Sequence, residues 1–317
     1  MGWTTAFDSA TFGAADVTST TLFGNNMGSV FVGDGSQADG VAVGSRSGNT
    51  NVFAHDVALQ GGLGTGADGR FAQLGFQVSD GIAQDGANLG AVPVVNGNIT
   101  VHTTNDIIAT GGSDSTSNYE FNYAQVGHVG ADQNTSNAIQ EIEAAATSNI
   151  RISAARHVTF SGGSAHGSYS QLGQGGLSAL GDHSGTTTLD VAGNVTFSAG
   201  SGYGSYSQLG QGGFSARGNH RGTTILNVDG NVTFSGGTAS FFAYSQLGQG
   251  GVFSIGSHDG TTTLNAGGNV TFTGGAGERA YSQLDGWRSI LEIGPRNRLR
   301  RQSLRTVPLK VLSRHAV

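Results

Sequence analysis

The sequence contains no cysteine, only three prolines, a single lysine and few charged residues, which make up 11% of the chain. Without cysteine, the protein has neither a disulfide framework nor a thiolate metal site. Scarce proline, with glycine that follows no three-residue period, excludes a collagen-like triple helix. The longest apolar stretch, near residues 89–95, is interrupted by Pro93 and is far shorter than the ~18 residues of a membrane-spanning helix. We therefore expect no transmembrane segment.

Charge is distributed unevenly along the chain. Residues 1–287 contain 20 Asp and Glu against 7 Arg, a formal charge of −13, whereas residues 288–317 contain 8 Lys and Arg against Glu292, a charge of +7. Nucleic-acid binding requires clustered Lys and Arg, so the acidic body predicts no nucleic-acid partner. The basic cluster at residues 296–301 is flanked by prolines, and we interpret it as part of a disordered or non-native tail. Residues 1–8 contain no basic segment followed by an apolar one, so no signal peptide is visible.

What the chain has in abundance is glycine, 55 of 317 residues, and internal repeats. Four elements recur: Gly-Asn-Val-Thr-Phe at 193–197, 230–234 and 268–272, with a shorter copy at 157–160; Tyr-Ser-Gln-Leu from Tyr169, Tyr206, Tyr244 and Tyr281; Gly-x-His-x-Gly around His183, His220 and His258; and Thr-Thr-Thr-Leu at 186–189, with echoes at 223–226 and 261–264. The valines of the first element lie 37, 37 and 38 residues apart. The one extra residue lies between Phe234 and Tyr244, in a Gly- and Ser-rich segment expected to be a surface loop.

Weaker copies extend the repeats toward the N-terminus, to about residue 55. We divide the chain into a Gly/Thr-rich β segment at 1–50 that continues into the repeats, the repeats at 51–287, and the basic tail at 288–317. Residues 140–146 are the one segment of the body whose composition predicts a helix.

The repeats predict an all-β protein. Their segments are short, β-branched or aromatic, and bounded by Gly, Asn, Asp and Ser, which is typical of strands between turns. Val195 and Phe197 alternate with polar residues, as do Leu189 and Val191, so one face of each strand is expected to be buried. No repeat is large enough to bury that face alone, whereas stacked repeats form a continuous core.

Two stacked architectures fit this pattern. A β-propeller would use ~40–50 residues per blade, but the spacing between repeats varies too widely for a closed ring. A parallel β-solenoid tolerates such variation and places identical side chains in ladders, such as Asn194, Asn231 and Asn269. We therefore favour the solenoid, with roughly two coils per repeat, a strand spacing of about 4.8 Å and a length of about 60 Å.

The repeat residues resemble those of large bacterial exoproteins of the filamentous haemagglutinin type, and the segments at 123–128 and 206–213 carry the likeness. The resemblance covers about residues 55–287. It implies a right-handed parallel β-helix and secretion to the bacterial cell surface. It also implies adhesion to glycans or proteins of host or neighbouring cells. The exposed strand edges at the ends of such a stack further predict end-to-end self-association.

The repeated histidines suggest a metal site as one interpretation. Two coils apart, they would lie ~10 Å from one another, too far to share a zinc ion whose ligand nitrogens lie at ~2 Å. We interpret them as turn residues. Asp182 and Asp259 occupy different positions in these turns and form no carboxylate ladder. Residues 61–68 faintly resemble a calcium-binding nonapeptide but have neither its aspartate spacing nor a repeat. The sequence thus predicts no metal or cofactor site.

A polysaccharide-active β-helix enzyme is the alternative function. Such an enzyme needs a pair of carboxylates or a basic residue in one groove. No acidic pair is repeated, and a pair would have to be assembled from distant positions such as Asp182 and Asp229. There is no Gly-x-Ser-x-Gly motif of a hydrolase. We therefore expect a structural, adhesive segment without catalytic residues.

Two further series have both a binding and a structural interpretation. The threonine runs could order water on a flat face, but Ile225 stands between Thr188 and Thr263, so we interpret them as the solvent side of a strand. The Tyr-Ser-Gln-Leu tyrosines could form a carbohydrate-stacking stripe or pack as corner aromatics, and we favour packing.

Overall fold

A computed structural model describes residues 5–7, 11–12, 19–23, 28–33, 35–36, 40–45, 47–63, 69–77, 94–113, 122–131, 143–144, 148–239, 241–284, 288–293 and 310–312. The described residues form strands, turns and loops without a helix, as the repeats predict. Three large sheets contain all but two of the strands, and every strand pair within them is parallel.

Each sheet is a row of neighbouring strands that runs along the molecule. Sheet 1 consists, in spatial order, of β1 (Thr5–Phe7), β4 (Val30–Val32), β7 (Val57–Gln60), β11 (Ile107–Thr110), β15 (Val158–Ser161), β18 (Val195–Ser198), β21 (Val232–Ser235) and β24 (Val270–Thr273). Sheet 2 consists of β27 (Lys310–Leu312), β26 (Arg288–Ile293), β23 (Gly260–Ala266), β20 (Gly222–Val228), β17 (Thr186–Val191), β14 (Ile150–Ala154), β10 (Ile99–Thr103), β6 (Asn49–Ala54) and β3 (Ser19–Phe23). Sheet 3 consists of β2 (Thr11–Phe12), β5 (Val41–Val43), β8 (Ala72–Leu74), β12 (Ala124–Val126), β16 (Ser170–Leu172), β19 (Ser207–Leu209), β22 (Ser245–Leu247) and β25 (Ser282–Leu284).

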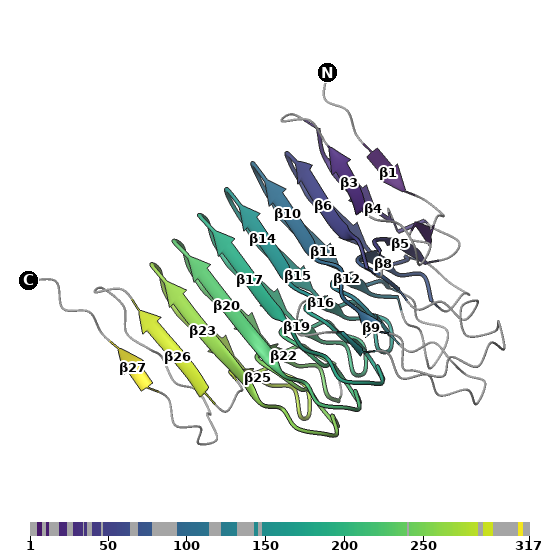
Figure 1. Ribbon diagram of the computed structural model, residues 1–317. Coiled ribbons are helices and arrows are strands. Elements are labelled where there is room, and N and C mark those ends of the chain that lie inside the picture. Colours follow the sequence, from purple (N-terminus) through teal and green to yellow (C-terminus); the bar gives the residue numbers. More distant parts are fainter. Residues whose placement is uncertain are drawn as a thin grey trace, which may run out of the picture.

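The chain visits the three sheets in turn. It passes from β14 in sheet 2 to β15 in sheet 1 and β16 in sheet 3, and then returns to sheet 2 as β17, which pairs with β14. Successive turns therefore lie side by side along a single axis, as the row of long strands from β3 to β27 shows (Figure 1). This stack of parallel sheets is the arrangement of a parallel β-solenoid. The propeller alternative is wrong, because propeller blades are antiparallel.

The predicted two coils per repeat are also wrong. Val158 pairs with Val195, and Val195 with Val232, so each repeat element lies directly beside its next copy. The residues counted as a second coil instead form loops, and these loops stack on one another through isolated bridges such as Gly175 to Gly212. At about 4.8 Å per strand, the nine strands of sheet 2 span about 38 Å, rather than the predicted 60 Å.

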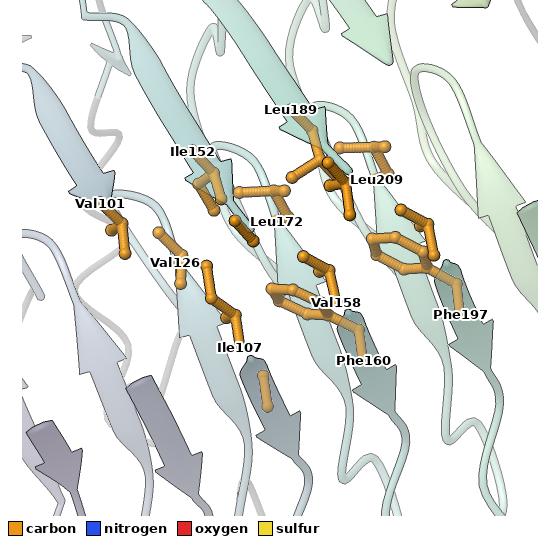
Figure 2. Packing of buried hydrophobic residues seen from close by; sticks show 14 of the residues in the cluster. Val101, Ile107, Val126, Ile152, Val158, Phe160, Leu172, Leu189, Phe197 and Leu209 are labelled. Atoms are coloured by element: carbon orange, nitrogen blue, oxygen red, sulfur yellow. The ribbon is translucent and has the colours of Figure 1, made fainter. Parts of the chain in front are cut away.

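The core lies between the three sheets. Along β17 and β18 every second residue is buried, so Leu189, Val191, Val195 and Phe197 point inward, as the alternation predicts. Figure 2 shows these inward rows, with side chains from the three sheets meeting in one interior. Phe160, Phe197, Phe234 and Phe272 form a ladder of parallel rings with centroids 5.0 Å apart.

Sheet 3 is covered on both faces. All three residues of β19 are buried, because the loops that flank it fold over its outer side. Leu209 belongs to the central core, whereas Tyr206 belongs to a second apolar cluster beneath these loops. The Tyr-Ser-Gln-Leu element therefore supplies both clusters, which explains why its Tyr and Leu do not share one face of the strand.

Polar side chains tie each turn to the next at the corners. The Oδ1 atom of Asn194 accepts the backbone N–H of Asn231 at 2.8 Å, and that of Asn231 accepts the N–H of Asn269 at 2.7 Å. Asp106 accepts the N–H of His157 at 2.9 Å at the same corner of an earlier turn. The predicted asparagine ladder is thus confirmed, and it satisfies backbone donors that the strands leave open at the corner.

Glycine is required where turns approach most closely. Gly210 has φ +141°, and a Cβ atom built on it would overlap the carbonyl group of Gly248 in the next turn. The equivalent Gly173 makes the same close approach to Gly210. A side chain at either position would separate two turns that the neighbouring strands hold together.

Three predictions from the sequence concern segments beside or between the repeats, and the structure describes part of each segment. The helix predicted at 140–146 is wrong at Glu143–Ala144, which form strand β13 and pair with β9 (Val94–Val95). Strands β1 to β5, within residues 1–50, join the same three sheets as the repeats. In the tail, β26 pairs in parallel with β23, and β27 pairs with β26.

The phenylalanine ladder predicts a position-dependent cost of truncation. Phe197 is fully buried between two other rings, so Phe197→Ala should lower the free energy of unfolding by about 3–5 kcal/mol. Phe272 is only partly buried, so Phe272→Ala should cost clearly less. Urea unfolding followed by circular dichroism measures both, and equal losses would contradict the packing described.

The asparagine ladder at the corners predicts that an aspartate can replace an asparagine as the hydrogen-bond acceptor. Asn231→Ala removes the acceptor of the Asn269 N–H and should destabilise the protein by about 1 kcal/mol. Asn231→Asp keeps an acceptor oxygen, as Asp106 does at its own corner, and should restore most of the loss. The same urea titration at pH 7 compares the variants. An Asp variant as unstable as the Ala variant would argue against the ladder.

Candidate functional site

Three of the four repeated tyrosines are interior residues. Tyr169, Tyr206 and Tyr244 are fully buried, as is Tyr123 of an earlier turn, and the rings of these four stack with centroids 4.6–4.9 Å apart. The packed interpretation is confirmed for them and the carbohydrate-stacking stripe is wrong, because neighbouring rings cover the faces that a sugar would need. Tyr281 stacks on Tyr244 at 5.4 Å and is partly buried.

Each buried tyrosine bonds to the glutamine of the preceding turn. The Tyr206 hydroxyl donates to Oε1 of Gln171 at 3.1 Å, and the Gln171 Nε2 donates to the carbonyl oxygen of Gly212 at 3.0 Å. Burial raises the pKa of Tyr206 well above its usual value, so its hydroxyl keeps the proton that it donates. This row is a polar spine that holds the loops against sheet 3.

The repeated histidines also form a stack, at half of the predicted separation. His183 and His220 are buried, and the ring centroids of His183, His220 and His258 lie 5.2 and 5.3 Å apart. The Nδ1 atoms of His183 and His220 lie 3.2 Å apart. Within the described part of the chain, no group of three or more His, Asp and Glu side chains is arranged to hold a metal ion.

The acidic residues of these turns act as caps or face solvent. Asp182 accepts from the side-chain amide of Asn219 at 2.9 Å and from its backbone N–H at 2.7 Å, and these hydrogen bonds lower the pKa of Asp182. Asp259 lies 3.9 Å from Arg221. The turns of Asp182 and Asp229 lie at opposite ends of β20, whose seven residues span about 23 Å, well beyond the ~9.5 Å limit of an inverting carboxylate pair. These two aspartates are therefore not brought together.

The other sequence candidates are placed as follows. Thr188, Ile225 and Thr263 lie in register on the outer face of sheet 2, so Ile225 interrupts the threonine row as expected. In the calcium-like segment, residues 64–68 lie outside the described residues, and so does the basic cluster at 296–301.

A shallow groove crosses the outer face of sheet 1. Asp106, Ile108, His157, Thr159, Asn194 and Thr196 line it. Asp106 is its one carboxylate, and that carboxylate already accepts the His157 backbone N–H. The groove has no second acidic group, so it does not provide a carboxylate pair for hydrolysis.

The feature that departs most from the repeat is a surface cluster that we call the aromatic patch, made of Tyr203, Phe214, Phe241, Phe242 and Phe253, together with the exposed Ile255 two residues after Phe253 in the same loop. Tyr203 (40%), Phe241 (36%), Phe253 (58%) and Ile255 (61%) are exposed. The rings pack edge to face: Phe253 lies 5.6 Å from Phe214 at 89° and 4.9 Å from Phe242 at 64°.

The backbone beneath the patch is in a conformation that disfavours large side chains. Phe242 has φ 58°, at the position that Gly167 and Gly204 occupy in earlier repeats. Phe253 also has φ 58°, where earlier repeats carry Ser178 and Ser215. Left-handed backbone at a non-glycine residue costs about 1–3 kcal/mol. A detailed alignment of the repeats could have found both positions, because the one extra residue lies in the loop of Phe242.

Comparisons with protein-family models, curated proteins and solved structures find no match to this chain. Among the described residues, no helix is long and apolar enough to cross a membrane.

The histidine stack predicts a pH-dependent stability. Burial and then the neighbouring His258 lower the pKa of His220 to about 4, and nearby Asp182 acts in the opposite direction. The unfolded chain, with a histidine pKa of ~6.5, binds more protons than the folded one between about pH 6.5 and 4. The contribution of His220 to stability is therefore complete above about pH 6.5. It falls as the pH is lowered through this window, by up to about 1.4 kcal/mol per pH unit.

Urea titrations at pH 7.5, 6, 5 and 4.5 measure this slope. His220→Asn should make the loss of stability with falling pH shallower, whatever it does to stability at pH 7.5. The exposed His102 supplies the matched control, and His102→Asn should leave the slope unchanged. An identical slope in wild type and His220→Asn would contradict the role given to the stack.

Proposed function

We propose that this chain is a non-catalytic segment of a secreted bacterial surface adhesin of the filamentous haemagglutinin type. It would be a right-handed parallel β-helix built from 37-residue repeats, and it would hold binding surfaces away from the cell. The observation that supports this proposal is the in-register stack itself: strands of three sheets repeat along one axis, with identical side chains in ladders. Such a stack is a stiff spacer whose length grows with every added repeat.

The surface of the stack fits a binding role better than a catalytic one. The carboxylates of Asp182 and Asp229 are far apart, and the groove on sheet 1 has one acid. The aromatic patch, in contrast, exposes apolar side chains on loops, where binding residues commonly lie. The partners would be glycans or proteins on host or neighbouring cells. Unpaired strand edges at the ends of the sheets would also favour end-to-end association.

Adhesion by the isolated chain tests the proposal. Latex beads coated with the chain should bind cultured epithelial cells, or a bacterial lawn, several-fold more than beads coated with albumin at the same density. The same preparation should release no reducing ends from soluble polysaccharides. Adhesion no better than albumin to either surface would contradict the adhesive role, and sustained release of reducing ends would favour the polysaccharide-active alternative.

A further inference from the structure

We infer that the aromatic patch is a binding site for a neutral saccharide, with the exposed ring of Phe253 stacking against the C–H face of a sugar ring. This inference rests on the proposed adhesive function and locates the adhesive contact on two adjacent turns of the stack. Its support comes from the size of the patch, its exposure, its charge and its backbone.

The size of the patch favours a small ligand over a protein. With 150–250 Å² for a whole aromatic side chain, the exposed parts of Tyr203, Phe241, Phe253 and Ile255 amount to about 400 Å². A stable protein interface needs about 800 Å² from each partner. A patch of this size is within the range often found at functional sites, and it matches a few sugar rings rather than a second chain.

The exposure of the patch selects a sugar among small ligands. An apolar small molecule is normally enclosed over 70–90% of its surface, whereas Phe253 and Ile255 are more than half exposed. A sugar ring needs one open aromatic face and keeps its hydroxyl groups in water. Phe253 is the most exposed ring of the patch, at 58%, so it offers such a surface to a ligand.

The charges near the patch favour a neutral ligand. Arg279 lies over the Phe242 ring at 5.2 Å, and its Nε is 3.9 Å from the Glu278 carboxylate, so the positive charge is balanced locally. Arg221 is balanced by Asp259 in the same way. Residues 1–287 carry a formal charge of −13, which repels an anionic polysaccharide.

The backbone disfavours one of the aromatic residues. Phe242 has a left-handed conformation where earlier repeats carry Gly167 and Gly204, at a cost of about 1–3 kcal/mol, whereas Phe253 shares its conformation with Ser178 and Ser215. The same turn contains the extra residue of the repeat, and its Ile255 occupies the position that Leu180 and Arg217 hold in the two earlier repeats. These changes together create one apolar surface, and strain of this kind gathers at functional sites.

The repeats supply the variants that test the site. Phe253→Ser restores the residue of Ser178 and Ser215, and Ile255→Arg restores that of Arg217, so both should keep the fold. Native gels cast with a soluble β-glucan, an α-glucan, a mannan or a xylan should retard the wild-type chain in at least one case. Phe253→Ser should weaken that binding at least fivefold, and the double variant should abolish it. Phe53→Ser, at an aromatic residue 38% exposed on sheet 2, is the matched control and should bind as wild type.

Four outcomes would overturn the inference: no retardation by any neutral polysaccharide, retardation by heparin alone, equal retardation of the double variant, or a concentration-dependent dimer that Phe253→Ser dissolves in sedimentation. Urea midpoints close to that of wild type verify that the variants fold.

The bead assay separates the two proposals. Beads that adhere equally well with the double variant refute the site but not the adhesive function, whereas saccharide binding without bead adhesion refutes the adhesive function alone.

Discussion

The parallel backbone ladder between one turn and the next is the interaction on which the rest of the structure depends. A single turn has three short strands whose N–H and C=O groups find partners only in adjacent turns, as Val195 does between Val158 and Val232. Its inward side chains likewise meet a core only when other turns lie above and below. Stability is therefore a property of the stack, and one repeat has little of its own.

The same ladder restricts composition. Strands about 4.8 Å apart in register bring equivalent side chains into contact, which suits stacked rings and chained amides but brings like charges together at a cost. The low charge of the chain, 11%, follows from this constraint. In the repeats of sheet 2, Arg151 lies in register with Asp190 on the adjacent strand and donates to its carboxylate at 3.0 Å. Asn227 of the next turn also donates to Asp190, at 2.8 Å.

Most of the fold could be predicted from the sequence because its repeats are local. The alternation around Val195 and Phe197 indicated the buried face, and the repeated Asn194 indicated the corner ladder. The number of coils could not be predicted, because composition does not tell a loop that folds over a sheet from a further strand. Glu143 and Ala144 show a related limit, since pairing with β9 overrides the helical preference of their segment. The tyrosines were ambiguous because Tyr206 faces a second cluster that exists only once the loops are in place.

A regular repeat also makes its own exceptions informative. A fold without repeats has no equivalent position with which an exposed phenylalanine at φ 58° could be compared. In this stack, Gly167, Gly204, Ser178 and Ser215 of earlier turns have the same left-handed conformation. The fold thus accepts small residues at these positions, and nothing in the ladder requires Phe242 or Phe253. Phe242 is buried against Phe214 and Phe253, so its contacts lie within the stack, whereas Phe253 is 58% exposed and can contact a ligand outside it.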